Sequence, residues 1–341
     1  MRILLEVLRG LPNITDCYVT WCGLPYISAT AVPFVSTVFQ ANLRKLSLDL
    51  SLENMPNLLG PTSFHVQNLE ELHLCIHSEN IDSAFERDEI MRSYLAPAIS
   101  RHHATLHILI IESWITADLS PLFQAIHHLP QLHDLSIAIP IESIHLGDPN
   151  GLTYFLNIHK SNLHTLRLRA SQYGGLGLTP DPISFGIWVR DAITGVHLTK
   201  LRVLDIRSNL FPIDTSVLCL RQFGQTITSL SLTGCYRSFD DVYEVMDVLV
   251  MVPLASLRIG ILSLSPQLFD LFSTKLDKLS RLELAVRYVL AHATDKPQFD
   301  NVHLQQESQI VSILAFFFSF VFFFLIYLLL KKKAFWHRMS S

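Results

Sequence analysis

The sequence has few cysteines and no cysteine framework. It holds five cysteines in 341 residues, an odd number, and no two of them form a C-x-x-C pair. This pattern matches neither a disulfide scaffold nor a zinc site built on paired cysteines. We therefore interpret the cysteines as reduced thiols, which favours a cytosolic or nuclear protein over a secreted one. They are Cys17, Cys22, Cys75, Cys219 and Cys235.

A strong charge and a secretory signal are also missing. The formal net charge is −4, which argues against a protein that binds nucleic acid through a general attraction to phosphates. The first ten residues carry only short apolar runs, which Glu6 and Arg9 interrupt, so they do not resemble a secretory signal peptide.

No motif for catalysis, metal binding or cofactor binding is present. The chain has 16 histidines but no H-E-x-x-H, no paired Cys and His ligands at zinc-site spacing and no G-x-S-x-G. The glycines between Gly174 and Gly177 lack the spacing and the lysine of a phosphate-binding loop. We therefore predict no catalytic residue, no metal ligand and no cofactor, and a protein that is not an enzyme. Solvated helix ends and strand edges account for the histidines.

What the chain does contain is a repeat. Residues Leu201 to Phe211 match the leucine-rich-repeat consensus L-x-x-L-x-L-x-x-N/C-x-L at every apolar position and at Asn209. Apolar residues with the same 1-4-6 spacing start at ten positions, 25 to 38 residues apart. These starts are residues 14, 43, 69, 106, 132, 163, 201, 227, 254 and 279. Cys22 and Cys235 occupy the position that Asn209 holds in its own repeat.

The repeats predict an α/β leucine-rich-repeat solenoid, a horseshoe of about ten units that covers residues 1–287. Each unit is expected to contain a strand, a turn and a helix, because apolar residues between the strands recur every three or four positions. The expected helices are 31–40, 88–100, 119–128, 151–159, 185–195, 215–223, 239–252 and 266–272. Residues 171–182 carry the glycines and prolines of a loop.

The C-terminal segment predicts a membrane anchor. Residues 288–309 form a polar linker, 310–330 contain no charged residue and 331–341 form a short basic tail. Seventeen of these twenty-one residues are Leu, Ile, Val or Phe, and as a helix the segment would be about 32 Å long, which matches a hydrocarbon core of about 30 Å. The positive-inside rule would place the repeats in a lumen, but without an export signal we favour a single-pass tail anchor with cytosolic repeats. An alternative is that the phenylalanine-rich run before Lys331 is translated non-coding sequence, and the protein is then cytoplasmic or nuclear.

The predicted partner-binding surface is the concave face of the sheet. The third, fifth and seventh residues of each repeat point away from the core, because strand side chains alternate. At these positions Arg167, Arg169 and Arg207 fall on adjacent strands, where they could bind carboxylates or a phosphate of a partner, pair with Asp205, or stay solvated. The candidate binding residues are Arg167, Arg169, Asp205, Arg207, Arg258, Ile108 and Ile110.

The repeats also resemble a known family. Strings such as Leu129-Pro-Gln-Leu132-His-Asp-Leu135 and Leu11-Pro-Asn-Ile14-Thr-Asp-Cys17 are similar to the leucine-rich-repeat half of fungal F-box proteins, over about residues 3 to 290. The resemblance implies a non-enzymatic scaffold that recognises protein substrates for a cullin–RING ubiquitin ligase. An F-box in front of the repeats would bind the Skp adaptor, but this sequence shows none. The alternative is a membrane-anchored leucine-rich-repeat adaptor unrelated to ubiquitin ligases.

Overall fold

The fold was analysed in a computed structural model. It describes residues 13–21, 42–59, 66, 68–77, 81, 83–113, 118–140, 146–171, 181–207 and 211–289. The chain divides into two compact units, 1–296 and 297–341, and all described residues belong to the first. Cys22, Asn209 and the predicted helices 31–40 and 310–330 lie outside the described residues.

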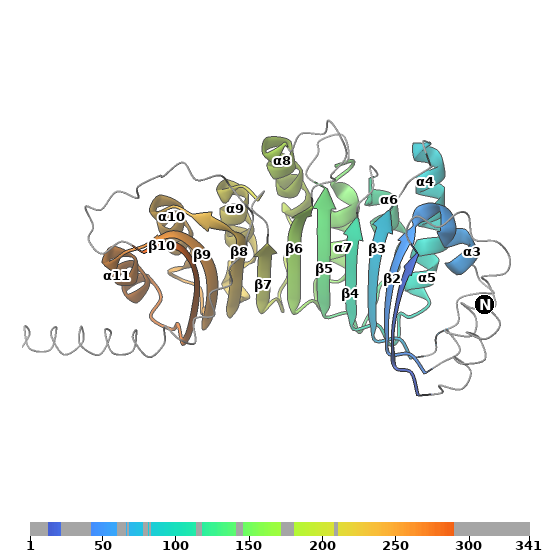
Figure 1. Cartoon of the computed structure of the whole chain (residues 1–341), viewed down its shortest axis with the longest axis horizontal. Coiled ribbons are helices and arrows are strands. Elements are labelled where there is room, and N and C mark those ends of the chain that lie inside the picture. Colours follow the sequence, from blue (N-terminus) through green and yellow to red (C-terminus); the bar gives the residue numbers. More distant parts are fainter. Residues whose placement is uncertain are drawn as a thin grey trace, which may run out of the picture. The chain divides into compact units, whose positions relative to one another are not determined.

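A single parallel sheet organises the first unit, and its ten strands lie side by side in chain order (Figure 1). The strands are β1 (Asp16–Trp21), β2 (Lys45–Ser51), β3 (Glu71–His77), β4 (Ile108–Ser113), β5 (Asp134–Pro140), β6 (Thr165–Ser171), β7 (Val203–Arg207), β8 (Ser229–Arg237), β9 (Ser256–Leu264) and β10 (Arg281–Val289). Because each strand pairs only with its predecessor and successor, the fold grows in one direction, as in a solenoid.

The strands confirm the repeat pattern. Each begins two residues after the first apolar residue of its repeat, as β1 does after Ile14 and β10 after Leu279. Equivalent repeat positions also pair across neighbouring strands, so that Leu46 lies beside Leu72 and Leu72 beside Leu109. The prediction of an α/β protein with ten strand-forming repeats is therefore correct.

Helical segments connect most of the strands and form a second layer along one side of the sheet (Figure 1). They are η1 (Leu52–Asn54), α3 (Met55–Leu59), α4 (Ala84–Ile90), η2 (Met91–Leu95), α5 (Ala96–Ser100), α6 (Ser120–Ala125), α7 (Asn150–Ile158), α8 (Pro182–Ile193), α9 (Ile213–Phe223), η4 (Gly224–Thr226), α10 (Phe239–Leu249) and α11 (Pro266–Lys275). Seven of the predicted helices are confirmed in place. The short helix after β2 was missed because five residues are too few to show a helical period.

The core lies between the sheet and the helices. The inward leucines of the repeats are almost completely buried, for example Leu135 and Leu166 at 0% exposure. From the helical side, Phe123 and Phe155 pack together, with their ring centroids 5.5 Å apart. At about 25 cal/mol per Å² of apolar surface buried, this layer contributes the main favourable term in folding.

One strand pair departs from the regular register. Between β8 and β9, Leu232 pairs with Ile259, but the next paired residue of β8 is Arg237. The intervening bulge contains Gly234, whose φ of 92° is open mainly to glycine. It also contains Cys235, which holds the repeat position equivalent to Asn209 and lies within β8. The Cys235 carbonyl approaches Gly260 so closely that a Cβ atom there would lie 2.0 Å from the oxygen.

Candidate functional site

The candidate site is the face of the sheet that points away from the core, here called the open face. It consists of the third, fifth and seventh residues of each repeat, as predicted, and of His77 at the ninth position of its repeat, because these alternate with the buried apolar residues along each strand. In β3 the strand shows this directly: Leu72, Leu74 and Ile76 are buried, whereas Glu71 and His73 are half-buried. Among the described residues, the helices pack with the opposite face.

A buried carboxylate anchors the middle of the open face. Asp134 of β5 is 9% exposed and forms an ion pair and hydrogen bond with the Arg167 guanidinium of β6. Burial raises the pKa of the Asp134 carboxyl, and the positive charge of Arg167 opposes this rise. Arg167 is therefore already paired with a carboxylate of its own chain, while about a third of its side chain stays exposed.

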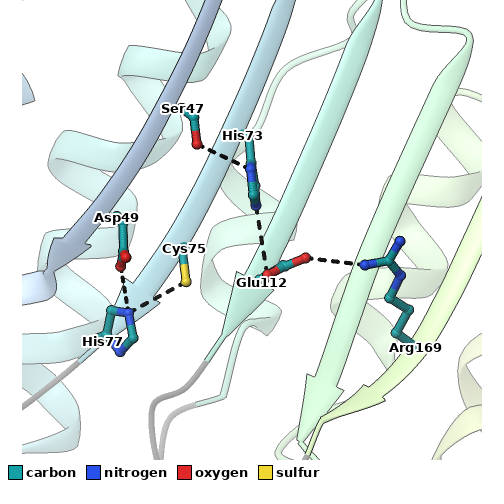
Figure 2. Close-up of polar contacts among 7 residues, drawn as sticks. All are labelled: Ser47, Asp49, His73, Cys75, His77, Glu112 and Arg169. Carbon is teal, nitrogen blue, oxygen red and sulfur yellow. Dashed lines mark hydrogen bonds and ion pairs between the residues drawn. The ribbon is translucent and has the colours of Figure 1, made fainter. Parts of the chain in front are cut away.

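A second polar chain links side chains of β2, β3, β4 and β6 across the sheet (Figure 2). Arg169 Nη1 lies 3.4 Å from Glu112 Oε1, and the other carboxylate oxygen lies 3.8 Å from His73 Nε2. The chain ends at Ser47, whose Oγ lies 3.2 Å from His73 Nδ1. The contact with His73 holds the pKa of Glu112 below its usual range, against the opposing effect of burial.

Small residues on β5 make this long contact possible. Glu112 of β4 and Arg169 of β6 both pair in register with Ala138, which lies between them. Because alanine has only a methyl group, the two long side chains meet above it and bury it to 6% exposure. Ser136, one open-face position earlier, is likewise buried at 3% exposure. The centre of the open face is thus ordered by ion pairs that reach across strands.

A third cluster lies at the far end of β2 and β3 (Figure 2). His77 Nε2 lies 2.6 Å from Asp49 Oδ1 and 3.4 Å from Cys75 Sγ. Asp49 pairs in register with Cys75, and His77 follows Cys75 by two residues on the same face. One ligand atom from each residue lies within 4.8 Å of the others, and all three residues are half-buried.

The predicted arginine group is only partly brought together. Arg169 and Arg207 are register partners, but Arg167 contacts Asp134 and Arg169 contacts Glu112, both on the β4 and β5 side. Arg207 lies 3.8 Å from Asp205, which is one of the pairings that the sequence left open.

The other candidates lie on the open face at separate places. Arg258 of β9 lies 3.0 Å from Glu283 of β10, and about half of its side chain is exposed. Ile108 and Ile110 of β4 are half-buried and lie in register with Asp134 and Ser136. They form a small apolar patch on β4, between the histidines of β3 and the strands that carry the arginines.

Sequence reasoning missed the carboxylate and histidine partners on this face. His73 was interpreted as a solvated histidine, whereas it joins Ser47 to Glu112. The cluster at Asp49 was missed because its members come from two repeats, and Cys75-x-His77 is not a spacing of known zinc motifs. The sequence did offer one signal, because residues two positions apart on a strand, such as Cys75 and His77, point to the same face of the sheet.

Histidine rings also lie close to one another where β4, β5 and β6 begin. The ring centroids of His107 and His133 are 5.4 Å apart, and those of His133 and His164 are 6.3 Å apart. These residues occupy the second position of successive repeats, and their strand-edge location is the one predicted. Partial burial, with a further effect of His107, lowers the pKa of His133.

Comparisons with known proteins identify no relative, so the class of the protein is defined from its fold and its open face. No protein-family model matches the chain, and no curated protein matches it either. The fold and the open face together define the class as an α/β protein of repeated strand–helix units with a solenoid-like parallel sheet.

The predicted membrane anchor falls outside the described residues. None of the described helices is both long and apolar enough to cross a bilayer. Residues 310–330 remain a sequence-based prediction.

Proposed function

We propose that the chain is a leucine-rich-repeat solenoid that binds a protein partner with its open face and catalyses no reaction. The observation that carries the proposal is a ten-stranded sheet with one face packed on helices and the other lined with paired, half-buried polar side chains. Such a face offers a broad surface whose side chains are already ordered, so binding costs less side-chain entropy.

The charges suggest where an acidic part of the partner would bind. Arg167 and Arg169 face Asp134 and Glu112, whereas Arg207 and Arg258 are more exposed, at 45% and 49% of their side chains. Guanidinium groups bind carboxylates through paired hydrogen bonds and are common in binding hot spots. We therefore propose that β7 to β9 receive acidic side chains of the partner and that Ile108 and Ile110 receive apolar ones.

Photo-crosslinking tests which face binds. A photoreactive phenylalanine analogue is placed at Ile110 on the open face and, as the matched control, at the exposed Arg221 on helix α9. We expect a discrete protein adduct from position 110 in cells of the native host and none from position 221. Equal adducts from both positions would contradict the proposal.

Charge reversal then tests the contacts. Arg207→Glu combined with Arg258→Glu is expected to weaken binding of the crosslinked protein by at least tenfold, whereas Arg190→Glu combined with Arg221→Glu on the helices should leave it unchanged. Charge reversal of Arg167 with Arg207 should also weaken binding, although part of that effect would come from the loss of the partner of Asp134. Unchanged affinity in the open-face variants would contradict the proposal that the partner binds this surface.

The resemblance to F-box proteins supports a role as the substrate-recognition half of a ubiquitin ligase. That role predicts an F-box on the native protein and co-purification with the Skp adaptor. The apolar run 310–330 favours the second candidate, a membrane-anchored adaptor. It predicts membrane association that resists alkali and disappears when residues 310–330 are deleted.

A further inference from the structure

Three side chains with the donor atoms of a transition-metal site meet on the open face. Asp49 supplies a carboxylate oxygen, Cys75 a sulfur and His77 an imidazole nitrogen, all within 4.8 Å of one another (Figure 2). We propose that Asp49, Cys75 and His77 bind one divalent zinc ion, which links β2 to β3. This site is separate from the arginine contacts on which the proposed partner binding depends.

The sheet register fixes the three residues before any ion binds. Asp49 and Cys75 are direct register partners, and Ser51 pairs with His77, so the backbone of two strands holds all three on one face. A site on paired strands is better preorganised than one on loops, because neighbouring hydrogen bonds hold the backbone of each ligand. Asp49 and His77 keep 17% and 27% of their side chains exposed, so an ion can enter from solvent.

The distances suit a tetrahedral ion. Zinc lies about 2.3 Å from sulfur, about 2.0 Å from nitrogen and about 2.0 Å from oxygen, so tetrahedral geometry separates sulfur from nitrogen by about 3.5 Å and nitrogen from oxygen by about 3.3 Å. The Cys75 Sγ to His77 Nε2 distance is 3.4 Å, already close to this value. The His77 Nε2 to Asp49 Oδ1 distance is 2.6 Å, the length of a hydrogen bond, and has to widen by less than 1 Å.

The donor set selects the class of ion. One thiolate, one imidazole and one carboxylate form a borderline set that suits zinc, whereas magnesium and calcium prefer oxygen ligands alone. Three protein ligands leave one position of a tetrahedral ion for a water molecule or a group of a bound partner.

Binding is expected to release protons. Zinc bonds to the thiolate, so the Cys75 thiol gives its proton to the buffer as the zinc–sulfur bond forms. His77 must coordinate through an unprotonated Nε2, so the proton of the neutral ring resides on Nδ1 in the complex. The ion thereby takes the place of the proton between His77 and Asp49, and no oxidation or reduction is involved.

Cobalt substitution provides the direct test. The full chain is prepared without a histidine tag, reduced, freed of metal with a chelator and titrated with Co²⁺. We expect one equivalent to bind, with the visible bands of a tetrahedral ion and a near-ultraviolet thiolate-to-cobalt band, and added Zn²⁺ to remove both. Absence of the thiolate band in the wild-type protein would overturn the proposal.

Variants assign the signal to the three residues. Cys75→Ser should abolish the thiolate band. His77→Gln and Asp49→Asn should each weaken zinc binding in calorimetry by more than the 10- to 100-fold loss that follows removal of an outer-shell partner. Circular dichroism establishes that each variant is folded, and Asp49→Asn serves as the conservative test if another variant is not.

Two matched controls separate this site from adventitious binding by the many histidines. His73→Gln changes a histidine on the same strand and face, and Cys235→Ser changes another half-buried thiol, in β8. Both should bind one equivalent with wild-type affinity. Loss of the thiolate band in Cys235→Ser, or its persistence in Cys75→Ser, would place the metal elsewhere and overturn the proposal.

Discussion

The two faces of the sheet follow different rules, as β3 shows. Its inward residues are all aliphatic and almost completely buried, and its outward residues are all polar and half-buried. The inward set is Leu72, Leu74 and Ile76, and the outward set is Glu71, His73, Cys75 and His77. Burial against the helices requires an apolar side chain at the same positions of every repeat. The identity of each outward residue depends instead on the particular neighbour that it contacts on another strand. The inward face therefore repeats, and the outward face differs from strand to strand.

The largest expected loss of unfolding free energy comes from truncating a side chain in the core between the sheet and the helices. Phe155 of α7 is completely buried, and its neighbour Tyr154 on the same helix is 49% exposed. Phe155→Ala leaves a cavity among packed side chains and should lower the free energy of unfolding by about 3–5 kcal/mol. Tyr154→Ala, the matched control, should change it by less than about 1 kcal/mol. Urea denaturation measures both, and equal losses would contradict the assignment of Phe155, and not Tyr154, to the packed core.

The sequence predicted the inward side well for a physical reason. Leucine at the first, fourth and sixth positions recurs because a strand beside a helix layer must bury one face, so the ten strands and seven helices could be placed from periodicity. The arrangement of the open face depends on the register and on side-chain reach. That Arg169 would cross Ala138 to meet Glu112, two strands away, is not visible in any single repeat.

A histidine within the helix layer makes the inward side sensitive to acid. His159 is fully buried, its Nε2 accepts a hydrogen bond from the Leu129 N–H, and its Nδ1 donates to the Phe155 carbonyl. Burial lowers the pKa of His159 to about 4, and the Phe155 contact opposes this change. The neutral ring thus has both nitrogens satisfied, and it joins α7 to the preceding repeat.

The pH dependence follows from linkage. Because the folded pKa of about 4 lies below the unfolded value of 6.5, the unfolded chain binds more protons between these values. The contribution of His159 is therefore complete above about pH 6.5, declines as the pH falls toward 4 and totals about 3 kcal/mol. Unfolding free energies measured from pH 7 to pH 4 should fall less steeply in His159→Gln. The same slope in both proteins would contradict the prediction.

A smaller effect is expected where the open face carries a partly buried ion pair. Arg167→Met removes the partner of the Asp134 carboxylate, whose side chain is only 13% exposed, and should cost about 1–3 kcal/mol of unfolding free energy. Adding Asp134→Asn should recover part of the loss, because the buried charge is then gone as well. Urea denaturation of the two single variants and the double variant gives the coupling. A double variant as unstable as the sum of the single ones would show that the pair does not stabilise the sheet.

The smallest effect is expected at the C-terminal end of the open face, where the ion pair is exposed. Arg258 and Glu283 lie 3.0 Å apart on β9 and β10, with 49% and 40% of their side chains exposed. Water and salt screen such a pair, so the coupling in a double-mutant cycle of Arg258→Ala and Glu283→Ala should be below about 1 kcal/mol and should decline further in high salt. Comparison with Arg167 and Asp134 tests whether burial sets the strength of contacts on this face. A coupling at Arg258 as large as that at Arg167 would contradict this rule. A small coupling would leave the Arg258 guanidinium able to exchange Glu283 for a carboxylate of a partner at little cost in stability.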